Sequence, residues 1–286
     1  MRTGIALWNH KDKGFLEKVE FFAANGFRAV SALGGQFVQI DEATGDGLAE
    51  LLRRHDLAFT IHHKLPSDEK PPTPEEFPSH LDVFLRWQRR HRLLTGLTFD
   101  VGPDPDVWMP HLRETLSAFR DEEVFICCED FPLTDAARAK LGGLEKEFPR
   151  LGILVDLGHM NLRLTARRGD ACVAPAPACS APADVERYLR AIPLPIRELH
   201  VHNNDGLRDQ HQHLGSGTLP VAVAGATLRA MKFDGISTIE FVPSWNDIPS
   251  PEGCELALAS ARQWESALGA GGGSGVARFQ GKEPPR

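Results

Sequence analysis

Short apolar runs alternate along the chain with longer segments in which apolar residues recur every three or four positions. The short runs have the length and the β-branched content of buried strands, whereas the longer segments have the period of amphipathic helices. The pattern predicts eight strands, at Gly4–Trp8, Phe27–Leu33, Ala58–His63, Leu97–Val101, Val124–Glu129, Gly152–Asp156, Ile196–His202 and Ile236–Val242. It predicts eight helices between and after them, at Phe15–Ala24, Gly47–His55, Leu81–Leu94, His111–Arg120, Asp135–Phe148, Ala183–Ala191, Val221–Met231 and Glu252–Leu268.

Eight strands that each precede a helix are the pattern of a single (β/α)₈ TIM barrel of the α/β class. The length of 286 residues is compatible with one such domain. We place the barrel in residues 1–268 and interpret the glycine-rich end, residues 269–286, as a disordered tail. A doubly wound sheet is the competing architecture, but no glycine-rich fingerprint follows the first strand. We therefore expect no nucleotide cofactor.

Two segments interrupt the regular alternation. Asn161–Pro182 is rich in alanine and proline, and Leu65–Pro78 contains five prolines. Both segments are predicted to be loops, and loops of this length are commonly lids or mobile excursions. The sequence leaves open whether residues 161–182 close over a site.

Composition narrows the class of partner. A hydrophobic share of 42% and a charged share of 25% are those of an ordinary globular protein. The net charge of -7 gives no general affinity for polyanions, so we do not expect a nucleic-acid partner. No apolar run approaches the length of a membrane span, and the N-terminus enters a strand directly, so we expect a cytoplasmic protein without membrane association. The five cysteines form no CxxC pair, and we expect them to be reduced. The sequence leaves open whether the protein forms a homo-oligomer.

Histidines and aspartates are concentrated around the seventh predicted strand. Between His200 and His213 the chain has four histidines and two aspartates. The strand period of two places His200 and His202 on one face and the apolar Leu199 and Val201 on the other. If the apolar face packs against helices, the imidazoles point into the barrel, where neutral imidazole is a common metal ligand. The alternative is a pair of core histidines followed by a solvated turn.

Four successive strands end in side chains that can bind a metal. Glu129 ends the fifth strand, Asp156 the sixth, and His202 the seventh, and Glu240 lies in the eighth. In a barrel these strand ends meet at one rim, where catalytic groups gather. Because unpaired carboxylates are costly to bury, a cation is the simplest explanation for the set. We predict a divalent metal site made by these four residues.

The earlier strands add weaker candidates. The third strand ends in His62, His63 and Lys64, and the fourth reaches Asp100. Each has an ordinary structural interpretation: His63 as a surface residue, Asp100 as a turn or cap, and Asp130, next to Glu129, as a solvated neighbour. These residues alone do not define a site.

These motifs resemble those of the xylose-isomerase-like barrel superfamily, which includes sugar isomerases and epimerases and the endonuclease IV class. The matching stretches are Cys128–Asp130, Val155–His159, His200–Asp205, Asp209–His211 with Gly215–Gly217, and Ile239–Glu240. Singly they are weak, but their order on successive strands is fairly specific for the superfamily. The resemblance spans nearly the whole barrel and implies its fold.

The resemblance to the ketose 3-epimerase branch implies a metal-dependent sugar isomerase or epimerase that works through an enediolate. It implies a divalent ion such as Mn²⁺, Mg²⁺, Co²⁺ or Zn²⁺ on the four predicted ligands, with Glu129 and Glu240 also acting as catalytic acid and base. It implies that His159 and Arg208 contact the substrate, although the residues before Arg208 differ from that branch. We add Lys64 and Trp8 as substrate contacts, for a carbohydrate or a phosphorylated sugar.

The resemblance to the endonuclease IV branch implies instead a multinuclear metallophosphoesterase. Its additional metal ligands would be His62 or His63, Asp100, His159, Asp209 and His211. Asp100 stands where that branch has a histidine, which weakens this alternative. The acidic chain favours the sugar enzyme, because a duplex-binding enzyme needs a positive surface. A third hypothesis is a barrel that keeps the metal site without catalysis, since one fold hosts many functions.

Overall fold

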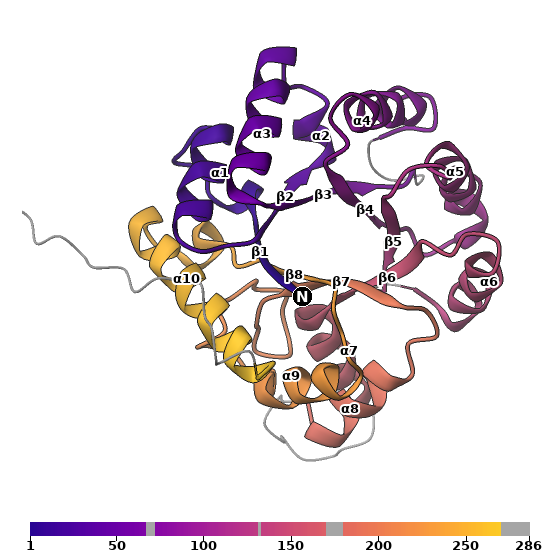
Figure 1. Cartoon of the computed structure of the whole chain (residues 1–286). Helices are drawn as coiled ribbons and strands as arrows, with labels where there is room; N and C mark the ends of the chain where they lie inside the picture. Colours follow the sequence, from indigo (N-terminus) through magenta and orange to yellow (C-terminus); the bar gives the residue numbers. More distant parts are fainter. Residues whose placement is uncertain (67–71, 131–132, 170–179, 270–286) are drawn as a thin grey trace, which may run out of the picture.

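The eight strands form one closed, parallel barrel in the order β1-β2-β3-β4-β5-β6-β7-β8, with helices around it (Figure 1), as the sequence pattern predicts. The structure is a computed structural model that describes residues 1–66, 72–130, 133–169 and 180–269. The strands are β1 (Arg2–Ala6), β2 (Ala29–Leu33), β3 (Ala58–Lys64), β4 (Leu94–Asp100), β5 (Phe125–Glu129), β6 (Leu151–Asp156), β7 (Ile196–Val201) and β8 (Ile236–Ile239).

The helices cover the outside of the barrel, as Figure 1 shows. They are α1 (Phe15–Ala24), α2 (Gly34–Phe37), α3 (Glu42–His55), α4 (Phe77–His91), α5 (Pro105–Ala118), α6 (Asp135–Glu145), α7 (Leu157–Gly169), α8 (Pro182–Arg190), α9 (Val221–Ala230) and α10 (Ser250–Ala267). Two short 3₁₀ helices, η1 (Leu7–Asn9) and η2 (Pro243–Asn246), follow β1 and β8. In the described residues, no helix combines the length and the hydrophobicity that crossing a bilayer requires.

The first part of one predicted loop is helical. Residues 161–169 belong to α7, so the prediction of a loop from Asn161 is wrong for that part. Leu157, Met160 and Leu164 are buried at helical spacing, and this period outweighs the alanine- and proline-rich composition further along. The rest of that loop, with Cys172 and Cys179, falls outside the described residues. Cys127, Cys128 and Cys254 are buried free thiols.

Alternation along the strands separates two environments. On β7 the apolar Leu199 and Val201 belong to the large hydrophobic core, while Glu198 and His200 are buried among the polar groups of the barrel interior. Glu198 Oε1 accepts hydrogen bonds from Thr60 of β3 at 3.2 Å and from Thr238 of β8 at 2.7 Å. The barrel interior is therefore polar below its carboxyl-end rim, as the alternation along β7 predicts.

A small apolar cluster lies at the amino end of the barrel. Ala29, Ala58 and Ile236 form a small buried cluster against which Phe125 packs. The polar residues that end the strands thus meet at the opposite, carboxyl end. In register, Asp156 of β6 lies beside His200 of β7, and Lys64 of β3 beside Asp100 of β4.

Candidate metal and active site

Asp156 lies at the centre of the predicted ligand set and is fully buried. Its Oδ1 accepts a hydrogen bond from the backbone N–H of His159 at 2.8 Å, in the first turn of α7. His202 Nε2 lies 2.9 Å from the same Oδ1 and 3.1 Å from Oδ2. Burial opposes ionisation, but His159 and His202 outweigh it and hold the pKa of Asp156 well below its usual range. Asp156 is thus ionised at neutral pH, and its contacts with His159 and His202 hold it in place.

His202 directly follows β7, and its ring lies against Gly158 at the start of α7. A Cβ at position 158 would come within 2.0 Å of the His202 Cε1 atom, so a side chain there would displace the imidazole. The His202 ring is fully buried, and its Nδ1 has no hydrogen-bond partner within the described residues. The glycine of the Asp156–His159 motif therefore makes room for a ligand contributed by the next strand.

Glu129, at the end of β5, contacts His159 rather than solvent. His159 Nδ1 lies 2.7 Å from Glu129 Oε1 and 3.6 Å from Asp156 Oδ2. Burial raises the pKa of Glu129 to about 8 even though His159 lowers it. His159 experiences the reverse balance, because burial disfavours its charge but Asp156, Asp209 and Glu129 together raise its pKa far above the usual range. The imidazole of His159 therefore contacts the carboxylates of both Glu129 and Asp156 at the rim.

Glu240, directly after β8, faces His200 and His211. Its Oε2 lies 3.0 Å from His200 Nδ1 and 3.7 Å from His211 Nδ1. Burial alone would raise the pKa of Glu240, but the two histidines lower it to about 2. Burial likewise opposes protonation of His200, but Glu240 raises the pKa of that imidazole to about 10.

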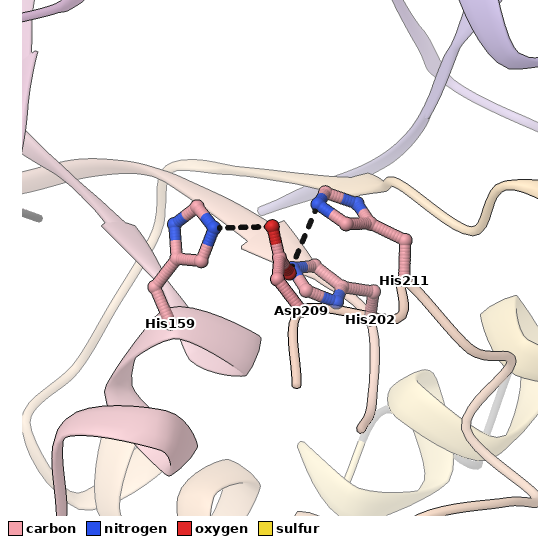
Figure 2. Close-up of side chains that lie close together, drawn as sticks. All are labelled: His159, His202, Asp209 and His211. Atoms are coloured by element: carbon pink, nitrogen blue, oxygen red, sulfur yellow. Dashed lines mark hydrogen bonds and ion pairs between the residues drawn. The ribbon is translucent and has the colours of Figure 1, made fainter. Parts of the chain in front are cut away.

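The loop after β7 brings Asp209 and His211 to the same place (Figure 2). Asp209 Oδ2 lies 3.2 Å from His159 Nε2, and its Oδ1 lies 3.3 Å from His211 Nε2. The His211 ring stacks on His202 with centroids 3.8 Å apart, and its Nδ1 lies 3.0 Å from the backbone oxygen of Glu240. His211 has φ of 44°, a left-handed backbone that is unfavourable for a residue with a side chain.

Two asparagines and a glycine hold this loop in place. Asn203 pairs with Gln212 through two backbone hydrogen bonds of 2.9 and 2.7 Å. Asn204 Nδ2 donates to the backbone oxygen of Gly158 at 2.8 Å, which ties the loop to α7. Gly217 has φ of 82°, and a Cβ there would meet Asn203 Oδ1 at 2.5 Å. The His200–Gly217 stretch thus folds as one unit that presents three imidazoles.

His62, Asp100 and Trp8 form a third side of the rim. His62 Nε2 lies 2.9 Å from Asp100 Oδ1, and Trp8 stacks on the His62 ring with centroids 5.8 Å apart. Burial opposes the protonation of His62, but Asp100 raises its pKa. Lys64 Nζ lies 3.9 Å from Asp100 Oδ2 at the exposed edge. These four predicted residues are therefore brought to the site.

The structure pairs three other residues with groups that are not among the predicted site residues. His63 points to the helix layer, where its Nε2 lies 3.1 Å from His80 Nδ1 and its ring is parallel to that of Phe77. Arg208 is exposed and its guanidinium pairs with Asp205 at 3.0 Å. Asp130 is not a solvated residue as expected: it is 1% exposed and accepts a hydrogen bond from Tyr188 at 2.5 Å.

His200 is a site residue that had no assigned role in the sequence prediction. Its ring lies 4.8 Å from that of His62, and its Nε2 has no hydrogen-bond partner within the described residues. The sequence does contain a feature that indicates this role, because the strand period places His200 on the same face as His202. The resemblance assigns a metal ligand to His202 and none to His200.

Ligand-capable atoms approach within 4.8 Å of one another in four overlapping groups. The groups are Asp156–His202–Glu240, Glu129–Asp156–His159, His62–Glu129–His200 and His159–His202–Asp209–His211. Asp156 belongs to two of them, so all four predicted metal ligands lie around this carboxylate. Side chains with such a mixture of carboxylate oxygen and imidazole nitrogen suit Mn²⁺, Mg²⁺, Co²⁺ or Zn²⁺.

The fold is that of the xylose isomerase-like barrels. A solved xylose isomerase domain protein from Alicyclobacillus acidocaldarius is 15% identical, with a TM-score of 0.65 over 96% of this chain and 100% of that chain. D-psicose 3-epimerase from Clostridium cellulolyticum H10 is 14% identical, with a TM-score of 0.66 over 94% and 99% of the two chains.

A D-tagatose 3-epimerase-like protein is 18% identical, with a TM-score of 0.65 over 94% of this chain and 98% of that chain. No family model and no curated protein matches the sequence. At these identities the likeness establishes the fold, and the reaction has to be argued from the site.

Proposed function

We propose that the protein is a divalent-metal-dependent isomerase or epimerase of a sugar or a related polyol. The observation that carries the proposal is the convergence of Glu129, Asp156, His202 and Glu240 at the carboxyl-end rim of the barrel. The similar structures that are named as ketose 3-epimerases support the choice of a carbohydrate substrate.

The chemistry of these four residues fits a bound cation. All four are at most 8% exposed, and three of them are carboxylates, which are costly to bury without a counter-charge. His202 Nδ1 and His200 Nε2 are buried polar atoms without a hydrogen-bond partner in the described parts of the chain. A bound ion with its substrate would give such atoms partners.

A divalent ion bound by Glu129, Asp156, His202 and Glu240 would stabilise negative charge that develops on neighbouring substrate oxygens. Glu129 and Glu240 would remove and return the proton on the carbon beside the sugar carbonyl, through an enediolate. They come from β5 and β8, which are not adjacent in the barrel, so they approach a bound sugar from different directions. His159 would orient the substrate, and Trp8 would form a wall of its pocket.

Metal counting tests this proposal directly. The protein should be stripped, reconstituted separately with Mn²⁺, Zn²⁺, Co²⁺ and Mg²⁺, and analysed for metal per chain and for turnover of a panel of ketoses. One exchangeable ion per chain together with interconversion of two sugars is the expected result. A chain that binds no divalent ion would contradict the proposal.

A metallophosphoesterase is the second candidate, favoured by the group His159–His202–Asp209–His211 (Figure 2). This group could hold a further ion next to the first, since His202 belongs to both ligand groups. Two or three tightly held ions per chain, with phosphodiester hydrolysis that is lost in His211→Ala, would support this alternative. Inertness toward a broad panel of phosphoesters would count against it.

A further inference from the structure

The indole of Trp245 is exposed beside the candidate site. Trp245 lies in η2 and is 61% exposed, whereas Trp108 and Trp264 are fully buried. In the described parts of the chain, only three large apolar residues are exposed, and the other two are Met1 and Leu207. Because an aromatic side chain removes a large apolar area from water when it is covered, a ligand that covers this ring would gain affinity.

Contacts on two sides hold η2 in place. Asn246 Nδ2 donates a hydrogen bond to the backbone oxygen of Gln210 at 3.1 Å, which ties η2 to the loop that follows β7. On the other side α10 packs closely on η2, since a Cβ at Gly253 would come within 2.6 Å of Pro243. The indole is therefore carried by a fixed segment, which lowers the entropic cost of binding a ligand to it.

The Trp245 ring contacts a histidine of the ligand cluster directly. It lies edge-on to the His211 ring, with centroids 5.1 Å apart and an angle of 82° between the planes. The His211 ring in turn stacks on that of His202, a proposed metal ligand (Figure 2). A perpendicular contact covers at most one face of the indole, so the other face is free. The neighbouring Asp209 side chain is 40% exposed, so this side of the site is open to a ligand from solvent.

The exposed apolar surface is on the scale of a small molecule rather than of a protein partner. One aromatic side chain buries about 150 to 250 Å², whereas a stable interface buries about 800 Å² on each partner. Leu207 is exposed in the loop that follows β7, but the next residue, Arg208, is charged, 75% exposed and paired with Asp205. The apolar surface therefore does not extend into a large patch.

The position of Trp245 determines which part of a substrate would meet it. A sugar whose carbonyl and neighbouring hydroxyl are bound at the four proposed metal ligands has its reacting carbons close to His202. The His211 ring separates His202 from Trp245. The carbons that reach the indole are therefore those remote from the carbonyl.

The chemistry of an aromatic face suits this part of a sugar. The face of the ring is negative and its edge is positive. The C–H hydrogens of a sugar are weakly positive, and hydroxyl groups stay free for water when C–H groups pack on a ring. We propose that Trp245 is a specificity-determining residue, whose indole face packs on the C–H groups at C4 to C6 of a six-carbon ketose. This assignment rests on the proposed function and narrows its substrate class to ketoses longer than four carbons.

Three variants separate the aromatic face from a general effect on the fold. Trp245→Ala removes the ring, and Trp245→Phe keeps an aromatic face. Leu207→Ala is the matched control, because it removes another exposed apolar side chain, from the neighbouring loop. Since both positions are exposed, all three variants should unfold within about 3 °C of the wild-type protein.

Calorimetric titration of the metal-loaded protein with two ketoses tests the role of the ring. D-psicose has six carbons, whereas D-erythrulose offers the same carbonyl and C3 hydroxyl but ends at C4. We expect the wild-type protein to bind D-psicose about tenfold more tightly than D-erythrulose, as one aromatic contact allows. In Trp245→Ala this ratio should fall to about one, because D-psicose loses affinity and D-erythrulose does not. Trp245→Phe and Leu207→Ala should keep most of the preference.

Quenching of tryptophan fluorescence by acrylamide measures the contact without turnover. The part of the quenching that is lost in Trp245→Phe comes from Trp245. D-psicose should reduce this part in the wild-type protein by covering the ring, and D-erythrulose should leave it unchanged. Quenching that is equal with and without D-psicose at saturation would contradict the contact.

Equal affinity for the two ketoses in the wild-type protein, or a preference that survives in Trp245→Ala, would overturn the assignment of Trp245. Ketose turnover by the same protein would then leave the isomerase proposal intact. If D-psicose binds in a Trp245-dependent way but no ketose is converted, the assignment stands and the isomerase proposal fails. Binding of neither sugar would overturn both. A smaller assembly in Trp245→Ala with an unchanged preference would assign the ring to a contact between copies of the chain instead.

Discussion

Buried histidines lie in two regions of this barrel, and their protonation is controlled in opposite ways. At the rim, the pKa of His200 is raised to about 10 and that of His211 to about 9. In the layer between barrel and helices, the pKa of His63 is lowered to about 3 and that of His10 to about 4. All four residues are at most 6% exposed, so the degree of burial does not distinguish them.

The difference between the two regions is the direct contact of the rim histidines with a buried carboxylate. Burial lowers the pKa in every case, but at the rim Glu240 lies 3.0 Å from His200 and 3.7 Å from His211. His63 faces the rings of Phe77, Phe84 and Phe99, and His10 faces Phe22. Histidine content alone therefore does not mark a site, whereas histidines facing buried carboxylates do.

Removal of the Glu240 charge should remove the difference in protonation between the two regions. Among the substitutions considered, it should have the largest effect on turnover. Glu240→Gln keeps the shape of the side chain but removes a proposed metal ligand and acid/base group, and it leaves His200 and His211 without their anion. We expect turnover to be abolished, a loss of at least about a thousandfold, and metal affinity to fall. Steady-state kinetics and metal titration measure both quantities. A variant with normal turnover would contradict the role of Glu240.

The second prediction concerns His63, in the layer between barrel and helices, and the dependence of the unfolding free energy on pH. Below pH 6.5 the unfolded chain protonates His63, but the folded protein does so only near pH 3, so folding loses stability as the pH falls through this window. The loss is about 2 kcal/mol at pH 5. In His63→Leu, the decrease in unfolding free energy between pH 7.5 and pH 5, measured with urea, should be smaller by this amount. An equal decrease in both proteins would contradict the effect.

Arg208 should give the smallest effect, because it belongs to neither region. Its side chain is 75% exposed and pairs with Asp205, and exposed ion pairs contribute about 0 to 1 kcal/mol. We expect Arg208→Ala to change the unfolding free energy by less than about 0.5 kcal/mol and KM by no more than about threefold. A tenfold rise in KM would show that the guanidinium leaves Asp205 to bind substrate.

The barrel and the placement of its four proposed metal ligands could be predicted from sequence because both depend on local rules. A strand period of two decides that His200 and His202 share a face, and parallel strands bring Glu129 and Asp156 to one rim. The prediction left a choice between His62 and His63. The structure directs His62 into the barrel, beside Thr98 and Asp100, which are polar residues on the same face of β4.

Other features depend on contacts that are distant in sequence. The buried carboxylate of Asp130 accepts hydrogen bonds from Tyr188 and Arg138, which lie 58 and 8 positions away in the sequence. The helical start of the 161–182 segment is set by the burial of Leu164 and its neighbours against the core.

The side-chain contacts around the rim form a continuous chain through four consecutive strand ends. Glu129 contacts His159, His159 contacts Asp209, Asp209 contacts His211, and His211 reaches the backbone oxygen of Glu240. Segments connected in this way are expected to unfold locally as one cooperative unit rather than independently. A substrate that displaces one of these four contacts would therefore displace the other three as well. The side chains at the mouth of the barrel would then rearrange together.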